Sequence, residues 1–294
     1  MKKVFVISLL LLIFFGWVNA GTIDTLTLHS DVMNRDIEVI VVKPTVKEVA
    51  KKKGTSRYVA PYEVKRYPVV YLLHGAYGDA RTWISIKPNL PALADELGMI
   101  FVTPSVLNSW YFDSPKIKDS QYESFMTRDL IEYIDSHYNT IPSRTARAIT
   151  GLSMGGHGAL FLAMRHKDIY GACASMSGGV DFRPFPQNWN LPDLLGEMAA
   201  NKAVWDSHTV AELVKTLSNH ELFITFDCGE DDFFLEVNKD LHKRLLGRGI
   251  DHDFTTRPGG HTCEYWNNSL DYHLLFFRKF GLYDKNVLKI LVTI

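Results

Sequence analysis

Short apolar runs alternate with amphipathic stretches along most of the chain. The apolar runs predict strands, and those in the middle of the sequence have few polar residues, as expected for strands buried on both faces. The stretches between them carry apolar residues at helical spacing. The predicted strands are 23–29, 37–42, 69–73, 99–103, 147–150, 173–176, 222–226 and 253–256, and the predicted helices are 92–97, 122–138, 154–166, 235–246 and 265–280.

This order of elements predicts an α/β fold. The first two strands show partial apolar and polar alternation, which is typical of an antiparallel pair. The later strands are mostly separated by helices, and this favours a mostly parallel sheet covered by helices on both faces. Because neither an internal repeat nor a low-complexity linker divides the chain, we expect one domain over residues 21–294.

Two segments depart from the alternation. Residues 43–65 carry three consecutive lysines and two prolines, which predicts an exposed loop with solvated charges. Residues 178–208 carry several aromatic side chains among three prolines, namely Phe182, Phe185, Trp189 and Trp205. A long irregular segment of this kind is often functional. We interpret it as an insertion over the sheet edge, with a packed surface loop as the alternative.

The first twenty residues have the layout of a secretory signal peptide. Lys2 and Lys3 precede an apolar run, and small residues lead to a cleavage site after Ala20. The apolar run is shorter than the roughly 20 residues that a bilayer requires. We therefore expect cleavage and export, to a periplasm or the outside of the cell, with no membrane contact by the mature chain.

Charge and cysteine content narrow the possible functions. The 294-residue chain has 32 Lys and Arg against 33 Asp and Glu, and loss of Lys2 and Lys3 leaves a net charge of 30 − 33 = −3. This balance provides no basic footprint for nucleic acid. Cys173, Cys228 and Cys263 do not have zinc-site spacing, so we predict no metal site. The first two are expected to be buried in strands, although one disulfide is possible.

The strongest local motif is Gly151-Leu152-Ser153-Met154-Gly155, which matches the pattern G-x-S-x-G between a predicted strand and a predicted helix. This context is typical of a nucleophile elbow, a tight turn that presents a serine oxygen at the end of a strand. Small residues at 155, 156, 158 and 159 leave one helix face nearly bare, so the helix should pack close to the sheet. We predict that Ser153 is a nucleophile.

A serine hydroxyl needs a base to act as a nucleophile. His261 ends a glycine-containing turn after strand 253–256, and Asp232 lies in an acidic turn after strand 222–226. We predict that Asp232 orients His261 and that His261 accepts the Ser153 proton. Asp231 is a rival for the acid because it is adjacent to Asp232, and Asp227 could instead cap the turn.

The loop after strand 69–73 is the predicted source of an oxyanion hole. It reads His74-Gly75-Ala76-Tyr77-Gly78, and loops of this kind supply one backbone N–H to the developing oxyanion. We assign that donor to Ala76 and the second to Met154, the residue after the nucleophile. The His74 and His157 side chains are expected to be structural.

At these residues the chain resembles the putative-esterase family of α/β-hydrolases, which includes feruloyl and acetyl-xylan esterases, S-formylglutathione hydrolases, tributyrin esterases and mycolyltransferases. The resemblance covers about residues 23–283 and rests on the runs 74–78, 151–159, 229–233 and 260–261. It implies an α/β-hydrolase fold and serine ester hydrolysis without a metal or organic cofactor. It also favours Asp232 over Asp231, because the family's acid falls third after the glycine.

The resemblance leaves the substrate open. Formylglutathione is a cytosolic thioester, so predicted export counts against an S-formylglutathione hydrolase. It favours a carbohydrate esterase that removes feruloyl or acetyl groups from small-molecule or polysaccharide esters. Tyr77, Trp110 and Trp189 are predicted to line an aromatic or sugar-binding cleft, whereas Trp266 is expected to pack in the core. The alternatives are a short-chain acyl esterase, an acyltransferase, and a non-catalytic binding protein on the same fold.

Overall fold

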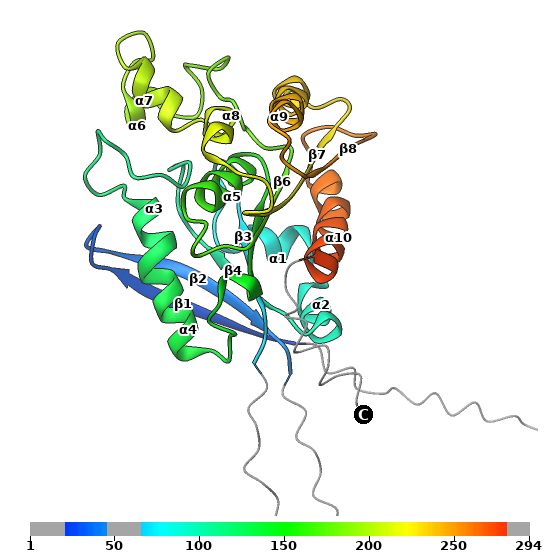
Figure 1. Cartoon of the computed structure of the whole chain (residues 1–294). Helices are drawn as coiled ribbons and strands as arrows, with labels where there is room; N and C mark the ends of the chain where they lie inside the picture. The colour runs from blue at the N-terminus through cyan, green and yellow to red at the C-terminus, as the bar shows by residue number, and fades with distance from the viewer. Residues whose placement is uncertain (1–20, 46–65, 281–294) are drawn as a thin grey trace, which may run out of the picture.

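A computed structural model describes residues 21–45 and 66–280 of the chain. Its centre is an eight-stranded sheet with the order β1-β2-β4-β3-β5-β6-β7-β8 (Figure 1). The strands from β4 to β8 in this order run parallel, and β2 pairs antiparallel with both β1 and β4. The predicted α/β class and the antiparallel pair at the start of the chain are confirmed.

The strands and helices follow the predicted order closely. The strands are β1 (Thr22–Ser30), β2 (Arg35–Lys43), β3 (Val69–Leu73), β4 (Ile100–Pro104), β5 (Arg147–Gly151), β6 (Ala172–Met176), β7 (Phe223–Gly229) and β8 (Asp253–Arg257). The predicted helices correspond to α2 (Leu90–Leu97), α4 (Leu130–His137), α5 (Met154–Arg165), α9 (Leu235–Gly247) and α10 (Cys263–Phe280). The predicted helix 122–138 is interrupted, because α3 (Tyr122–Ser124) passes into a π-helical turn, η1 (Phe125–Asp129), before α4.

Helices cover both faces of the sheet, as predicted. One face packs against α4, α5 and α9, and the side chains of strand residues such as Val41, Tyr71 and Ile149 lie on this face. The other face packs against α1 (Thr82–Ile86), α2 and α10, and Val70 and Phe101 point toward it (Figure 1). This alternation along single strands follows from the two-residue period of a strand, so both faces become apolar.

The predicted insertion 178–208 is not a bare loop. It contains α6 (Leu191–Leu195) and α7 (Lys202–Ser207), and α8 (Val210–Leu213) follows it. The expectation that it lies over the sheet edge needs correction, because it packs across the carboxyl ends of the strands. Ser114, in the loop after β4, donates a hydrogen bond to the Leu194 carbonyl at 2.7 Å, and Phe185 contacts Phe234 after β7.

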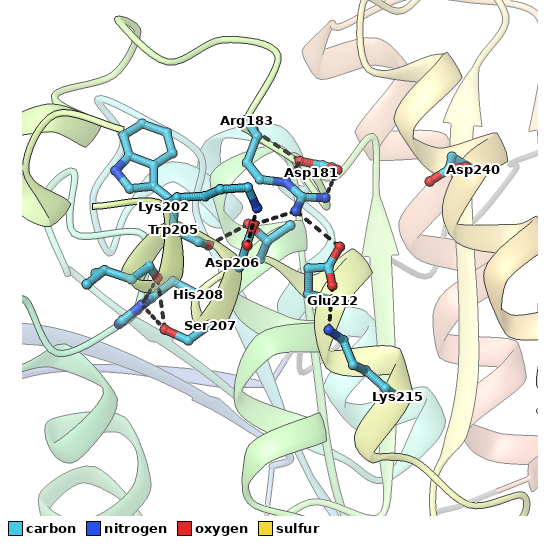
Figure 2. A network of polar contacts seen from close by, with 12 residues as sticks. Asp181, Arg183, Lys202, Trp205, Asp206, Ser207, His208, Glu212, Lys215 and Asp240 are labelled. Atoms are coloured by element: carbon cyan, nitrogen blue, oxygen red, sulfur yellow. Dashed lines mark hydrogen bonds and ion pairs between the residues drawn. The ribbon is translucent and has the colours of Figure 1, made fainter. Parts of the chain in front are cut away.

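Ion pairs hold the inserted segment in place. The Arg183 guanidinium contacts the carboxylates of Asp181, Asp206 and Glu212 at 2.6, 2.7 and 3.1 Å (Figure 2). These groups come from the loop after β6, from α7 and from α8, so one side chain links two parts of the segment to the helix that follows it. Trp205 is fully buried and donates from its indole nitrogen to the Gly196 carbonyl.

Some predictions concern residues outside the described ranges, and others can be compared with the structure only within those ranges. The predicted signal peptide 1–20 and most of the predicted loop 43–65 lie outside the described residues. Within the described ranges, no helix has both the length and the apolar composition of a membrane span. Cys173, Cys228 and Cys263 are free thiols, and the first two are buried in β6 and β7 as predicted.

Candidate active site

Ser153 occupies a strained turn between β5 and α5. Its backbone has φ 55° and ψ −117°, a conformation that non-glycine residues rarely adopt. Neighbouring glycines make the turn possible: a Cβ on Gly151 would approach the Gly155 carbonyl oxygen to 2.4 Å, and one on Gly155 would approach the Leu73 carbonyl oxygen to 2.4 Å. The predicted elbow and the close packing of α5 against the sheet are therefore present.

The side chains of Ser153, His261 and Asp232 form one hydrogen-bonded chain. His261 Nε2 lies 2.9 Å from Ser153 Oγ, and His261 Nδ1 lies 2.8 Å from Asp232 Oδ2. The Asp232 side chain is fully buried, and its Oδ1 accepts the Phe234 backbone N–H. With Nδ1–H directed at the carboxylate, His261 Nε2 is free to accept the serine proton, which is the geometry of general-base activation.

The turns after β7 and β8 bring the acid and the histidine together. The Asp231 backbone N–H donates to the Gly259 carbonyl at 2.9 Å, and the Glu230 N–H donates to the Arg257 carbonyl at 2.9 Å. A Cβ on Gly229 would approach the Gly259 carbonyl oxygen to 2.3 Å, so this close approach requires glycine. The turn directs the Asp232 side chain inward and leaves Asp231 exposed.

The loop 74–78 lies beside the nucleophile. A Cβ on Gly75 would be 3.3 Å from Ser153 Cβ, so the loop backbone and the serine are in close proximity. Ala76 follows directly, and Met154 begins α5, where backbone N–H groups have no partner within the helix. Both predicted oxyanion donors thus border Ser153, and their catalytic role remains a prediction.

His74 and His157 are structural, as expected. The His74 ring contacts the Gly75 carbonyl through Nδ1 at 2.7 Å and accepts the Val106 N–H through Nε2 at 3.0 Å, so it fixes the loop beside Ser153. Burial lowers its pKa below the ordinary value for histidine. Burial likewise lowers the pKa of His157 to about 4, and its Nε2 contacts the His208 carbonyl.

The predicted aromatic cleft is only partly as expected. Trp110 was predicted to line it, and this is wrong: the side chain is 1% exposed and packs against Phe182 at 5.1 Å between ring centroids. Two positive φ angles, at Trp110 and Tyr111, turn the chain so that both rings enter the core. Trp266 is buried in the other core cluster, as expected, and its ring lies 4.9 Å from that of His261 between centroids, with the two ring planes nearly perpendicular.

Phe233 is a residue of the site that sequence analysis missed. Its side chain is 52% exposed, and its ring centroid lies 4.4 Å from that of His261. Trp189 is half-buried and stacks on Phe233 with an interplanar angle of 18°. Tyr77, 78% exposed, lies in the loop beside Ser153. The sequence did contain one indication of the role of Phe233: it is adjacent to Asp232, and a residue next to the acid lies close to the base.

A second polar network connects β5, β7 and β8 with α10. Asp227 on β7 accepts hydrogen bonds from Ser269 and Arg257 at 2.6 and 2.7 Å, so it does not cap the turn. His273 Nε2 lies 2.9 Å from the Asp227 carboxylate, and its Nδ1 lies 2.8 Å from Thr150 Oγ1. The network joins α10 to β5, β7 and β8, the three strands that lead to Ser153, Asp232 and His261.

The ionisable side chains of the site are not arranged for metal binding. Across residues 21–45 and 66–280, the structure has no group of three His, Cys, Asp or Glu side chains that could hold a metal ion. The chemistry that the geometry provides is that of a serine, a base and an acid next to backbone N–H donors. This arrangement suits acyl transfer from an ester.

The fold and the arrangement around Ser153 define a serine hydrolase of the α/β-hydrolase class. Residues 30–277 match the family described as "Putative esterase". The chain therefore belongs to this family, and it is a carboxylic ester hydrolase.

Individual relatives agree with this class. The chain is 25% identical over 256 residues to an acetyl esterase of Caldicellulosiruptor saccharolyticus, a match that covers 82% of this chain and 92% of the relative. It is 26% identical over 200 residues to S-formylglutathione hydrolase of Mus musculus, covering 60% and 69% of the two chains. A solved ferulic acid esterase structure has a TM-score of 0.71 at 29% identity, covering 88% of this chain and 98% of that one.

Proposed function

We propose that the protein is an exported carbohydrate esterase that removes feruloyl or acetyl groups through an acyl-enzyme on Ser153. The observation that carries the catalytic part is the hydrogen-bonded chain from Ser153 to His261 and Asp232, with contacts of 2.9 and 2.8 Å. The mechanism requires each of these three side chains in its observed position.

In the first half-reaction, Ser153 Oγ attacks the ester carbonyl while His261 Nε2 takes its proton. The negative charge that develops on the carbonyl oxygen is stabilised by the Ala76 and Met154 N–H groups, and one such donor contributes about 3 kcal/mol in known serine hydrolases. His261 then protonates the departing alcohol, and Asp232 stabilises the histidine cation. In the second half-reaction, water gives a proton to His261 and attacks the acyl carbonyl, and His261 returns the proton to Ser153 Oγ as its bond to the acyl group breaks and the acid leaves.

The acyl part of the substrate is supported by the aromatic surface next to His261. The rings of Phe233 and Trp189 stack with an interplanar angle of 18° beside the base, and Tyr77 is exposed in the loop beside Ser153. A planar aromatic acyl group would stack on such a surface. The ferulic acid esterase and acetyl esterase relatives support the same two acyl groups.

Export is supported by the sequence of residues 1–20 alone. A charged start, an apolar run and small residues before Gly21 fit a cleaved signal peptide. An exported enzyme would meet polysaccharide esters, whereas formylglutathione is a cytosolic compound. This separates the proposal from the activity named for the S-formylglutathione hydrolase relatives.

Acyl preference tests the proposal directly. The protein comprising residues 21–294 is assayed with methyl ferulate and p-nitrophenyl acetate, each in the presence and absence of an added alcohol. A kcat/KM that favours ferulate supports an aromatic acyl pocket, and activity on acetate alone supports deacetylation. Capture of the acyl group by the added alcohol in preference to water would instead establish the acyltransferase alternative.

A further inference from the structure

A cavity of about 280 Å³ lies between the loop after β4 and α6. One side is formed by Leu107, Asn108, Ser109, Ile117, Asp119 and Ser120, and the other by Asn190, Asp193 and Leu194 of the inserted segment. Arg35 on β2 and Tyr122 on α3 complete the lining, and the Arg35 guanidinium donates to the Tyr122 hydroxyl at 3.3 Å. The cavity has room for a single sugar ring, and it is distinct from the serine, histidine and acid described above.

Two residues of the cavity lining are linked to the surroundings of the active site. On one side, Asn108 Oδ1 accepts the backbone N–H of Tyr77 at 2.6 Å, and Tyr77 directly follows Ala76 of the oxyanion loop. On the other side, Asn190 directly follows Trp189, whose ring stacks on Phe233 beside His261. Asn108 and Asn190 therefore connect the cavity to the residues that surround Ser153 and His261.

The lining has the chemistry of a site for hydroxyl groups. It presents two carboxylates, Asp119 and Asp193, and two carboxamides, Asn108 and Asn190, with the Ser109 and Ser120 hydroxyls nearby. Carboxylates accept hydrogen bonds from hydroxyl groups, and carboxamides both accept hydrogen bonds from them and donate to them. The one cation among the lining residues is Arg35, which leaves a net negative charge that disfavours anionic ligands.

The backbone around the cavity is held in uncommon conformations. Leu107, Trp189 and Asn190 have φ angles of 53°, 52° and 60°. Such conformations persist where surrounding structure enforces them, and they concentrate at functional sites. The ion pairs of Arg183 supply part of that enforcement, because they fix the segment that carries Trp189 and Asn190 (Figure 2).

We propose that this cavity binds the sugar ring that carries the ester, so that the alcohol part of the substrate is recognised through its free hydroxyls. The proposal rests on the proposed function and adds to it the class of the alcohol and the residues that bind it. In this arrangement the rings of Trp189 and Phe233 contact the acyl group, and Asn190, the residue after Trp189, contacts the sugar.

Two acetate esters with rings of the same size test this assignment. Mono-acetylated methyl β-xylopyranoside carries free hydroxyls, and cyclohexyl acetate has none. The measured quantity is the ratio of their kcat/KM values, which removes changes common to all acetates. We expect the wild-type ratio to favour the xyloside by at least about tenfold, because sites built for hydrogen bonding discriminate against ligands that lack the partner group.

The variants are Asp193→Ala and Asn190→Gly, with Asp168→Ala as the matched control. Glycine tolerates the φ of 60° at position 190, so this variant removes the amide without straining the backbone. Asp168 is an exposed carboxylate in the turn between α5 and β6, at the opposite end of the sheet. We expect both cavity variants to lower the ratio about tenfold and the control to keep it.

A wild-type ratio near one, or a ratio that neither cavity variant changes, would overturn the sugar subsite. Cyclohexyl acetate hydrolysis that is lost in Ser153→Ala would, in that case, still support the esterase mechanism. Equal hydrolysis of both acetates by wild type and Ser153→Ala would instead show that the proposed function itself is wrong.

Discussion

The side chains of Asp227 and His273 meet in the core, with Oδ2 2.9 Å from Nε2 and both groups almost completely buried. This contact ties α10 to β7. Thr150 and Arg257 extend it to β5 and β8. Since these strands end near Ser153, Asp232 and His261, the network helps to fix the spacing of the strand ends on which the site depends.

We expect His273→Leu to lower the free energy of unfolding by about 3–5 kcal/mol, because it leaves a buried carboxylate with one partner fewer. Urea denaturation measures the loss. Leu275→Ala, at a position on the same helix that is 58% exposed, is the control and should change the stability by no more than about 0.5 kcal/mol. A similarly small loss for His273→Leu would show that the network contributes little.

The two adjacent aspartates should differ sharply in their effect on catalysis. Asp232→Asn removes the carboxylate that orients His261, and the corresponding change in serine hydrolases lowers kcat about 10⁴-fold. Asp231→Asn changes an exposed side chain that does not contact His261 and should retain the wild-type kcat. Steady-state kinetics with p-nitrophenyl acetate distinguishes them, and comparable losses in both variants would reject Asp232 as the orienting acid.

Stability should depend on the titration of His157. Burial lowers the pKa of this residue to about 4, whereas an unfolded histidine titrates near 6.5. The unfolded chain therefore binds the extra proton first as the pH falls below about 6.5, and the folded state loses on the order of 3 kcal/mol between pH 7 and pH 4. The nearest ionisable groups are His208, which opposes protonation, and Asp181, which favours it.

The measurement is the free energy of unfolding of wild type and His157→Asn at several pH values from 7 to 4. Asparagine does not titrate, so the variant should lose less stability on acidification than wild type. His220→Asn, at an exposed position, should follow the wild-type curve. Parallel curves for wild type and His157→Asn would contradict this prediction.

Phe233 should contribute to selection of the acyl group. We expect Phe233→Ala to lower the kcat/KM ratio of methyl ferulate to p-nitrophenyl acetate about three- to tenfold, the range for loss of one aromatic stacking contact. Phe223→Ala removes a similarly exposed ring, 48% against 52%, at the far end of β7 and serves as the control. An unchanged ratio in Phe233→Ala would exclude stacking of the acyl group on this ring.

The central sheet and the three residues of the candidate site were predictable from the sequence. Buried parallel strands are nearly all apolar, so their positions were visible, and the ends of three strands carried Ser153, Asp232 and His261. The turns beside these residues require glycine because a Cβ would meet neighbouring backbone at Gly151, Gly155 and Gly229, so the glycines in the sequence marked the turns.

What the sequence did not reveal depends on side-chain direction in loops. Trp110 follows no regular period, and a positive φ turns it into the core. Phe233 and the cavity beside Asn190 arise where segments distant in the chain meet. The short helices of 191–213 were missed because each has too few residues to show a helical period, and tertiary packing of apolar residues such as Trp205 holds them in place.

The most direct test of the catalytic account is ester hydrolysis by the 21–294 protein and by its Ser153→Ala variant, with folding of both confirmed by circular dichroism. We predict that wild type hydrolyses p-nitrophenyl acetate or methyl ferulate and forms a covalent acyl adduct on Ser153 that mass spectrometry detects. The variant should lose both the adduct and at least about 10³-fold in kcat. Hydrolysis that persists at the wild-type rate in Ser153→Ala would contradict the mechanism.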